Sequence, residues 1–227
     1  MKPNQTSAYA YTQHQTTVKI IEEVCSRQVV TLSQDRTIDP VGDVLRQLPP
    51  EALTQGATLY VVMPVDKLIE LKSRAPNLRV LLLQLDGGVV ERLTGRPYDP
   101  KAEYPSDIVR QALKVIEIRG GHIKYMSFKE MIDEVVRKGF RKVGIFNDVM
   151  REGVKIALQR LGIDGIELVK SCDHNCVEVN PLGHKSGYRI SFPGTAGRLT
   201  PEQIAEALLN GTARLYHVEV ESEEVLC

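Results

Sequence analysis

The sequence predicts an α/β protein with a three-layer, mainly parallel sheet of the Rossmann-like kind and antiparallel additions at both termini. Short apolar runs, such as LYVVM at 59–63 and LRVLLLQL at 78–85, have the character of buried strands. Capped segments with helical periodicity alternate with such runs. From residue 122 onward the order is β-α-β-α-β with short loops, which implies right-handed crossovers and a parallel sheet.

The chain begins with a polar stretch, residues 1–14, which we expect to be a disordered tail. We expect residues 15–227 to form one α/β domain. The β-rich runs 17–24 and 28–32 predict a hairpin or two edge strands. The expected elements that follow are helices at 40–48, 65–74 and 106–118, strands at 59–63, 78–85 and 89–93, and a turn at 86–88. A proline-rich loop at 94–105 is the candidate boundary between two lobes.

The second half gives clearer signals. Ser127 and Glu130 form a capping-box pattern that begins a helix ending at Gly139. Thr200, Pro201 and Gln203 begin a last helix in the same way. The other expected elements are strands at 122–126, 142–146, 166–170, 188–192 and 214–221, a helix at 148–161, and a long loop at 172–187.

Composition excludes several classes of protein. The 29 basic and 29 acidic residues cancel and aromatic residues are only 5%, so we expect no nucleic-acid partner. No apolar run approaches the roughly 20 residues that cross a bilayer, so we expect no membrane partner. Four cysteines and no signal-peptide pattern favour a cytoplasmic protein with reduced thiols. A net charge of zero is compatible with a homo-oligomer.

Polar residues directly follow several predicted strands. Asp86, Gly87 and Gly88 come after 78–85, and Asn147 and Asp148 come after 142–146. Ligands of parallel sheets bind beyond the carboxyl ends of the strands, so these residues are candidate ligand-binding groups, with Asp86 and Asp148 as catalytic candidates. The alternative is structural: Asp66 and Asp148 cap helices or occupy their first turns, and Asp86, Gly87 and Gly88 form a tight turn.

The densest reactive cluster is Cys172, His174 and Cys176, with His184 eight residues further on. Thiolate and imidazole are zinc ligands, and in an extended loop residues two apart share a face, so these four residues are a candidate site for zinc or another transition metal. Alternatively, Cys172 is a nucleophile activated by a histidine, or Cys172 and Cys176 form a reversible disulfide. The structural alternative makes them ordinary loop residues.

A glycine-rich loop precedes the last helix. Gly194, Thr195 and Gly197 allow close approach of a ligand to the backbone, and Arg198 and Thr200 are candidate ligands for a phosphate or carboxylate. The pattern is neither a Walker A loop nor a complete Gly-x-Gly-x-x-Gly. The structural alternative is a turn in which Thr200 is the helix N-cap.

The stretch RKVGIFNDVMREGVKIALQRLGIDGIE, residues 141–167, resembles a segment of the aspartate/glutamate racemase superfamily. The resemblance implies a β-α-β unit. The paired cysteine motifs of that family do not occur in this sequence, so its catalytic residues are not transferred.

These features predict an enzyme that acts on a small polar, anionic molecule, with the 172–184 loop holding a metal for hydrolase or lyase chemistry. A cysteine-dependent isomerase or hydrolase is one alternative. A non-catalytic sensor or binding module, with the Cys/His loop as a structural clip, is another. A scaffold or assembly subunit is a further class.

Overall fold

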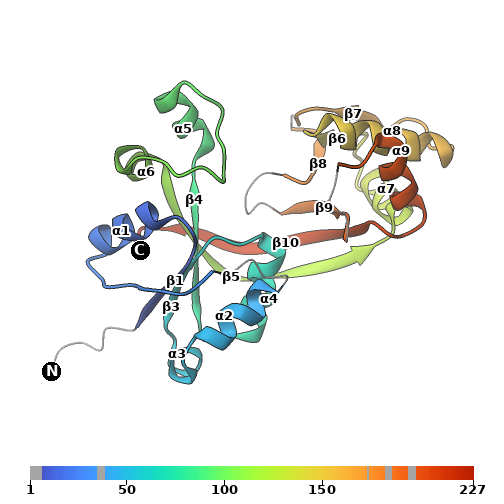
Figure 1. Cartoon of the computed structure of the whole chain (residues 1–227). Coiled ribbons are helices and arrows are strands. Elements are labelled where there is room, and N and C mark those ends of the chain that lie inside the picture. Colours follow the sequence, from blue (N-terminus) through green and yellow to red (C-terminus); the bar gives the residue numbers. More distant parts are fainter. Residues whose placement is uncertain (1–6, 35–38, 173, 182–185, 194–197) are drawn as a thin grey trace. The chain divides into compact units, whose positions relative to one another are not determined.

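A computed structural model describes residues 7–34, 39–172, 174–181, 186–193 and 198–227 (Figure 1). The chain is mixed α/β, and its strands follow one another in the hydrogen-bonded order β2-β1-β3-β4-β5-β10-β9-β8-β6-β7. It divides into two compact units, here unit 1 (Met1–Gly121 with Val220–Cys227) and unit 2 (His122–Glu219). Strands β5 (Leu113–Met126) and β10 (Arg214–Val225) contribute residues to both units.

The sheet of unit 1 reverses its direction of growth around β1. Strands β2 (Val30–Thr31) and β3 (Thr58–Val61) pair in parallel with opposite edges of β1 (Ala8–Tyr11). Strand β4 (Arg79–Leu85) continues the parallel sheet beside β3, and β5 pairs with β4 in antiparallel. The chain therefore leaves β1 to one side and returns to its other side for β3.

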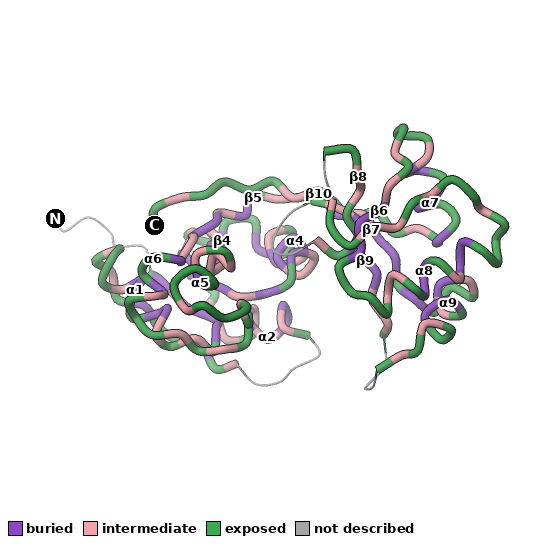
Figure 2. The backbone as a smooth tube through the Cα atoms, turned by 90° about the horizontal axis from the view of Figure 1, so that it is seen from above, coloured by how far each residue is buried: buried purple, intermediate pink, exposed green. Residues whose placement is uncertain are grey.

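Helices cover both faces of this sheet. Leu59 and Val61 on β3 belong to an apolar cluster with α2 (Pro40–Gln47), α3 (Pro50–Gln55) and α4 (Val65–Arg74). Tyr60, between them, belongs to a second cluster with α1 (Gln15–Val24). Since successive strand residues point to opposite faces, the two clusters lie on opposite sides of β3, and Figure 2 shows the buried positions in purple. Helices α5 (Gly87–Thr94) and α6 (Ser106–Ala112) connect β4 to β5.

In unit 2, three helices pack against the sheet in one hydrophobic core. Strands β9 (Gly187–Ser191), β8 (Cys176–Val179), β6 (Lys142–Ile145) and β7 (Glu167–Val169) are parallel, and β10 pairs with β9 in antiparallel. Val143 and Ile145 of β6 enter one core with residues of α7 (Phe128–Arg137), α8 (Asp148–Arg160) and α9 (Pro201–Leu209). Helices α8 and α9 pack closely, because a Cβ atom on Gly153 would lie 2.4 Å from Ile204 Cγ2.

The largest differences from the sequence prediction lie near the N-terminus. Ala8–Tyr11, within the expected tail, form the buried strand β1. The run 17–24 was expected to be a strand, and that prediction was wrong, because it lies in helix α1 and buries Thr17, Val18, Ile20 and Ile21. Packing of one helix face against the sheet overrides the β-propensity of its branched residues.

Three further predictions were wrong in their element type. Residues 89–93 are part of helix α5 rather than a strand. The helix expected over 106–118 ends at Ala112, and β5 runs on through Gly120 and Gly121, where we expected a stop. The expected loop 172–187 contains β8.

The two units divide at Gly121 and Glu219 rather than within 94–105. Helix 65–74 and both capping boxes are confirmed.

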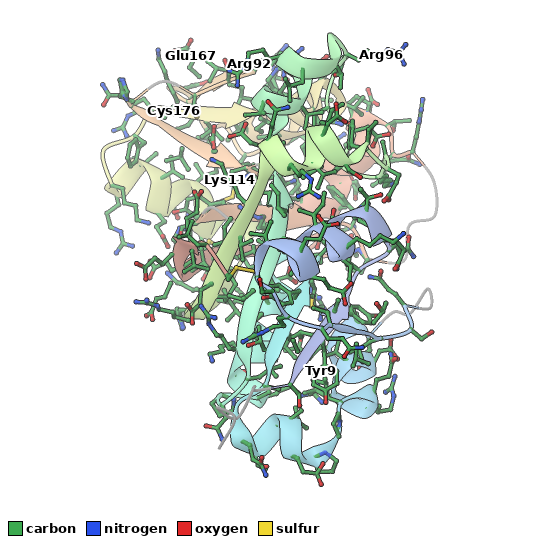
Figure 3. The ribbon with its side chains drawn as sticks, turned by 90° about the vertical axis from the view of Figure 1, so that its left-hand side faces the viewer. Tyr9, Arg92, Arg96, Lys114, Glu167 and Cys176 are labelled. Carbon is green, nitrogen blue, oxygen red and sulfur yellow. A yellow bond between two sulfur atoms is a disulfide. The ribbon has the colours of Figure 1, made fainter. Side chains whose placement is uncertain are left out.

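The cysteines form two disulfides, so the expectation of reduced thiols was wrong for this structure. Cys25 pairs with Cys227 at a Cα–Cα distance of 5.7 Å, and Cys172 pairs with Cys176 at 5.2 Å. Figure 3 draws the sulfur–sulfur bonds in yellow and labels Cys176. Among the described residues, no helix is both long and apolar enough to span a bilayer.

The Cys25–Cys227 disulfide joins the end of α1 to the last residue of the chain, 202 positions away, within unit 1. Closing so long a loop restricts the unfolded chain strongly, so we expect Cys227→Ser to lower the free energy of unfolding by about 2–5 kcal/mol. Urea unfolding of the intact chain measures the loss. Cys25→Ser and the double variant should lose the same amount, and additive losses would contradict a single shared bond.

Candidate functional site

Asp86 and its glycines lie at the carboxyl edge of unit 1, where β4 ends. Asp86 Oδ1 accepts a hydrogen bond from the Val89 N–H at 3.1 Å and so caps α5, and Lys114 Nζ lies 3.1 Å from Oδ2. The hydrogen bond from Lys114, followed by that from Val89, lowers the pKa of Asp86. Gly87 is approached closely by Tyr98, whose Cδ1 would lie 3.0 Å from an added Cβ. Asp86 is therefore the N-cap of α5, and the tight turn expected at 86–88 was wrong, because Gly87 and Gly88 begin that helix. Lys114 is labelled in Figure 3.

The ends of β1 and β3 are neighbours at the same edge. Thr12, directly after β1, is only 2% exposed, and Met63 beyond β3 is 7% exposed. The His14 N–H donates to Thr12 Oγ1 at 3.1 Å. His14 is the N-cap residue of α1, yet its side chain makes no capping hydrogen bond. The helix therefore takes a hydrogen-bond acceptor from elsewhere in the chain.

That acceptor is Glu103, which comes from the loop before α6. Its Oε1 accepts from the Thr16 N–H at 3.1 Å, and its Oε2 lies 3.2 Å from His14 Nδ1. Burial alone would raise the pKa of Glu103, but the hydrogen bonds from Thr16 and His14 outweigh it and the pKa is lowered. The Glu103 carboxylate thus lies at the connection between the end of β1 and the start of α1.

The loop that carries Glu103 is held by its own contacts. Tyr98 and Tyr104 stack with ring centroids 6.1 Å apart, and the Tyr98 N–H donates to Glu91 Oε1 at 3.0 Å. Tyr104 Oη accepts from the Asp99 N–H at 2.9 Å. These contacts fix the loop beside α5, so Glu103 is presented from an ordered segment.

In unit 2, Asn147 and Asp148 lie where β6 ends. Asn147 Oδ1 accepts from the Met150 N–H at 2.9 Å and caps α8. Asp148 pairs with Arg151, whose Nη1 also donates to the Ile145 carbonyl at 2.9 Å. The hydrogen bond from Arg151, with the charge of Lys170, lowers the pKa of Asp148. Asp148 thus has the first-turn role of the structural alternative, and both residues belong to a different unit from Asp86.

The predicted metal ligands are only partly described. Cys172 and Cys176 are bonded to each other, and His174 is exposed. His184 lies outside the described residues. Among the described residues, no three His, Cys, Asp or Glu side chains lie close enough together to hold a metal ion. Zinc ligation and nucleophilic attack both require a thiolate, so the disulfide form fits neither, and both stay predictions for the reduced chain.

The glycine-rich loop is also only partly described, because Gly194, Thr195 and Gly197 lie outside the described residues. Thr200 Oγ1 accepts from the Gln203 N–H at 3.2 Å, and Gln203 Oε1 accepts from the Thr200 N–H at 2.9 Å. Thr200 is therefore the N-cap of α9, as the structural alternative states. Arg198 is exposed.

Among the described residues, the acid whose pKa is lowered furthest was not predicted from the sequence as a site residue. Glu134 on α7 is 8% exposed. Its Oε1 accepts from Lys138 Nζ at 2.8 Å and from Tyr188 Oη at 2.9 Å, and its Oε2 accepts from Lys124 Nζ at 2.8 Å. Hydrogen bonds from Lys124 and Lys138 lower its pKa from 4.5 to about 2, against the effect of burial. The ring of Tyr188 also packs on that of His217, 4.6 Å away.

This network borders a groove of about 360 Å³ between the end of β5 and α7. Its lining combines both charges with one exposed aromatic ring: Lys124, Tyr125, Met126, Glu130, Asp133, Glu134 and Arg137. One sequence signal was present, because Glu134 lies beside the apolar stripe Phe128, Met131, Ile132 and Val135 that α7 buries. An acid next to such a stripe needs partners on the neighbouring strands.

Comparison of the chain with protein-family models, with curated proteins and with solved structures gave no match.

Glu134 should make the stability of unit 2 sensitive to acid. Its folded pKa of about 2 lies below the unfolded value of 4.5, so its contribution is complete above pH 4.5 and is lost as the pH falls toward 2. The full contribution is on the order of 3 kcal/mol. Urea unfolding at pH values from 7 to 2 should show this loss in the native chain, and Glu134→Gln should be destabilised at pH 7 with a flatter acid limb.

The matched control for this prediction is Asp133→Asn, one position earlier on α7. Asp133 pairs with Lys129 at 2.8 Å, but both side chains are more than half exposed. An exposed pair contributes at most about 1 kcal/mol, so this variant should unfold almost like the native chain. Equal effects of the two substitutions would contradict the special role of Glu134.

Proposed function

We propose that the chain is a small-molecule-binding protein, and that unit 1 is a doubly wound, Rossmann-like domain that takes a small anionic ligand at the carboxyl ends of β1 and β3. The observation that carries the proposal is the strand order β2-β1-β3-β4-β5. In doubly wound sheets of this order the ligand binds where the order reverses, which is between β1 and β3. The antiparallel strand β5 departs from the all-parallel form, but it lies two strands away from that point.

The directions of the connections in unit 1 support a ligand site at this reversal. The connection that leaves β1 contains α1, and the connection that leaves β3 contains α4. These helices belong to clusters on opposite faces of the sheet. The two segments that leave β1 and β3 therefore diverge, as they do around the ligand crevice of doubly wound sheets.

The anionic character of the ligand is supported by Glu103. Its carboxylate receives the Thr16 N–H and contacts His14 at this same edge, which means that the edge presents donors suited to an anion. Glu103 also caps α1 in place of the His14 side chain. Capping a helix and binding an anion both depend on the free N–H groups and the partial positive charge at the helix N-terminus. A ligand anion would replace Glu103 at these donors.

We favour a binding module or sensor over the metal-dependent enzyme. The two acids chosen as catalytic candidates act as a helix cap (Asp86) and as a first-turn ion pair (Asp148). The Cys172–Cys176 bond corresponds to the structural clip of the sensor alternative. Each of these chemistry-bearing residues thus has a structural partner that accounts for its position.

Binding is tested by thermal unfolding and calorimetry of the intact chain with inorganic phosphate, a dicarboxylate and a nucleoside monophosphate, each compared with an uncharged analogue. We expect at least one anion to bind, and Glu103→Gln to bind it about three- to tenfold more tightly. Removing a like charge beside an anion near a protein surface relieves on the order of 1 kcal/mol of repulsion.

The control is Glu23→Gln. Glu23 is also an acid near α1 in unit 1, but it pairs with Arg110 near the C-terminal end of that helix. Its removal should leave the affinity unchanged within about twofold. The proposal fails if no anion binds either the native chain or the Glu103 variant at millimolar concentration, or if both variants change the affinity equally.

A further inference from the structure

The connection between β7 and β8 in unit 2 is unusually short. Both strands are parallel to β6, which lies between them in the sheet. Strand β7 ends at Val169 and β8 begins at Cys176, so the chain passes from one side of β6 to the other within six positions, of which the structure describes 170–172, 174 and 175. Crossovers between parallel strands generally take about a dozen residues or more and contain a helix. This one is too short for a helix that spans the sheet.

The Cys172–Cys176 disulfide lies directly on β6 at this crossing. A Cβ atom on Gly144 would lie 2.5 Å from Cys172 Sγ and 3.3 Å from Cys176 Sγ. Val143 and Ile145, the neighbours of Gly144 on β6, belong to the core formed with α7, α8 and α9. Gly144 therefore faces away from that core, and the disulfide covers β6 where a second helix layer would otherwise pack.

An exposed aromatic residue continues this face. Phe146 follows Gly144 by two positions, just beyond the end of β6, and is 68% exposed. Its ring is contacted by Lys170, whose Nζ lies 5.4 Å from the ring centroid. Lys170 is the first residue of the same crossing connection. A change in that connection would therefore alter the cover of both Gly144 and Phe146.

We propose that the Cys172–Cys176 disulfide is a redox switch that holds Cys172 and Cys176 against Gly144 of β6. Both cysteines are partly exposed, so a reductant can reach them. A dithiol reductant attacks one sulfur as its thiolate and forms a mixed disulfide, and its second thiol then displaces the cysteine. Cys172 and Cys176 end as two thiols, and the reductant ends as a cyclic disulfide with the two electrons removed from it. This switch belongs to unit 2 and is independent of the anion site.

The second disulfide of the chain shows why this one suits a reversible role. Cys25 and Cys227 are 202 positions apart, whereas Cys172 and Cys176 are 4 apart. Opening the short link frees only a local connection, and its two thiols stay close enough to close again at a small entropic cost. Opening the long link releases the end of the chain from α1.

The test is graded reduction of the intact, folded chain with dithiothreitol, followed by alkylation and peptide mass spectrometry. We expect Cys172 and Cys176 to be labelled at a reductant concentration at least threefold below that needed for Cys25 and Cys227. The far-ultraviolet circular dichroism should stay unchanged, and removal of the reductant in air should restore the bond. The switch is excluded if these cysteines are already free in protein purified without reductant, or if they react only as the chain unfolds.

Gly144→Ala tests the seat of the disulfide on β6. The added methyl group would collide with Cys172 Sγ, so the disulfide form is destabilised relative to the dithiol form. The dithiothreitol concentration at which half of the bond is reduced should therefore be at least threefold lower than in the native chain. The matched control is Gly88→Ala on α5, where an added Cβ meets only Asp86 Oδ1 at an ordinary 3.4 Å. Its half-reduction point should not move, and equal shifts in both variants would overturn the assignment.

A second variant keeps the proposal testable if Gly144→Ala does not fold. Cys172→Ser/Cys176→Ser mimics the open state without strain on β6. We expect hydrogen exchange to become at least tenfold faster at the amides of β6 and β8, with no change in β1 and β3. Unchanged exchange in β6 and β8 would mean that the bond fastens nothing and would sink the proposal.

Discussion

Each pair of parallel strands in this chain needs a connection that returns across the sheet, and the length of that connection decides what covers the sheet face. In unit 1 the returns contain whole helices, and apolar clusters form on both faces, around Leu59 on one side and Tyr60 on the other. In unit 2 the return from β7 to β8 has only residues 170–175. The Cys172–Cys176 disulfide covers that face of β6 instead of a helix, and a side chain at Gly144 would collide with it.

The same constraint places the candidate ligand site. Because α1, which follows β1, and α4, which follows β3, pack on opposite faces, the segments that leave these strands diverge, and the Thr16 N–H lies at the carboxyl edge. Glu103 satisfies this donor from a loop 87 positions away in the sequence. The polar groups at the other strand ends, Asp86 and Asn147, are satisfied locally as caps. The edge between β1 and β3 is thus distinguished by an acceptor that a second segment must supply.

Local signals predicted the parts of the fold that local physics determines. The capping boxes at Ser127 and Thr200 and the helix over Val65–Arg74 depend on neighbours within one turn, and they were found correctly. Helix α1 and strand β1 depend on burial against distant strands, and branched residues such as Val18 and Ile21 suit a strand equally well when considered alone. The Glu134 network was missed because its partners, Lys124 and Tyr188, lie 10 and 54 positions away.

The cysteine pair shows most directly why a cluster of reactive side chains does not define its own chemistry. Spacing alone allows Cys172 and Cys176 to be metal ligands, a nucleophile with its neighbour, or a disulfide. Gly144 favours the last of these, because its missing side chain leaves room for two bonded sulfurs against β6. A larger residue at that position would push the connection outward and separate the sulfurs from the strand. The role of the pair is therefore encoded 28 residues before Cys172, at a position that carries no reactive group.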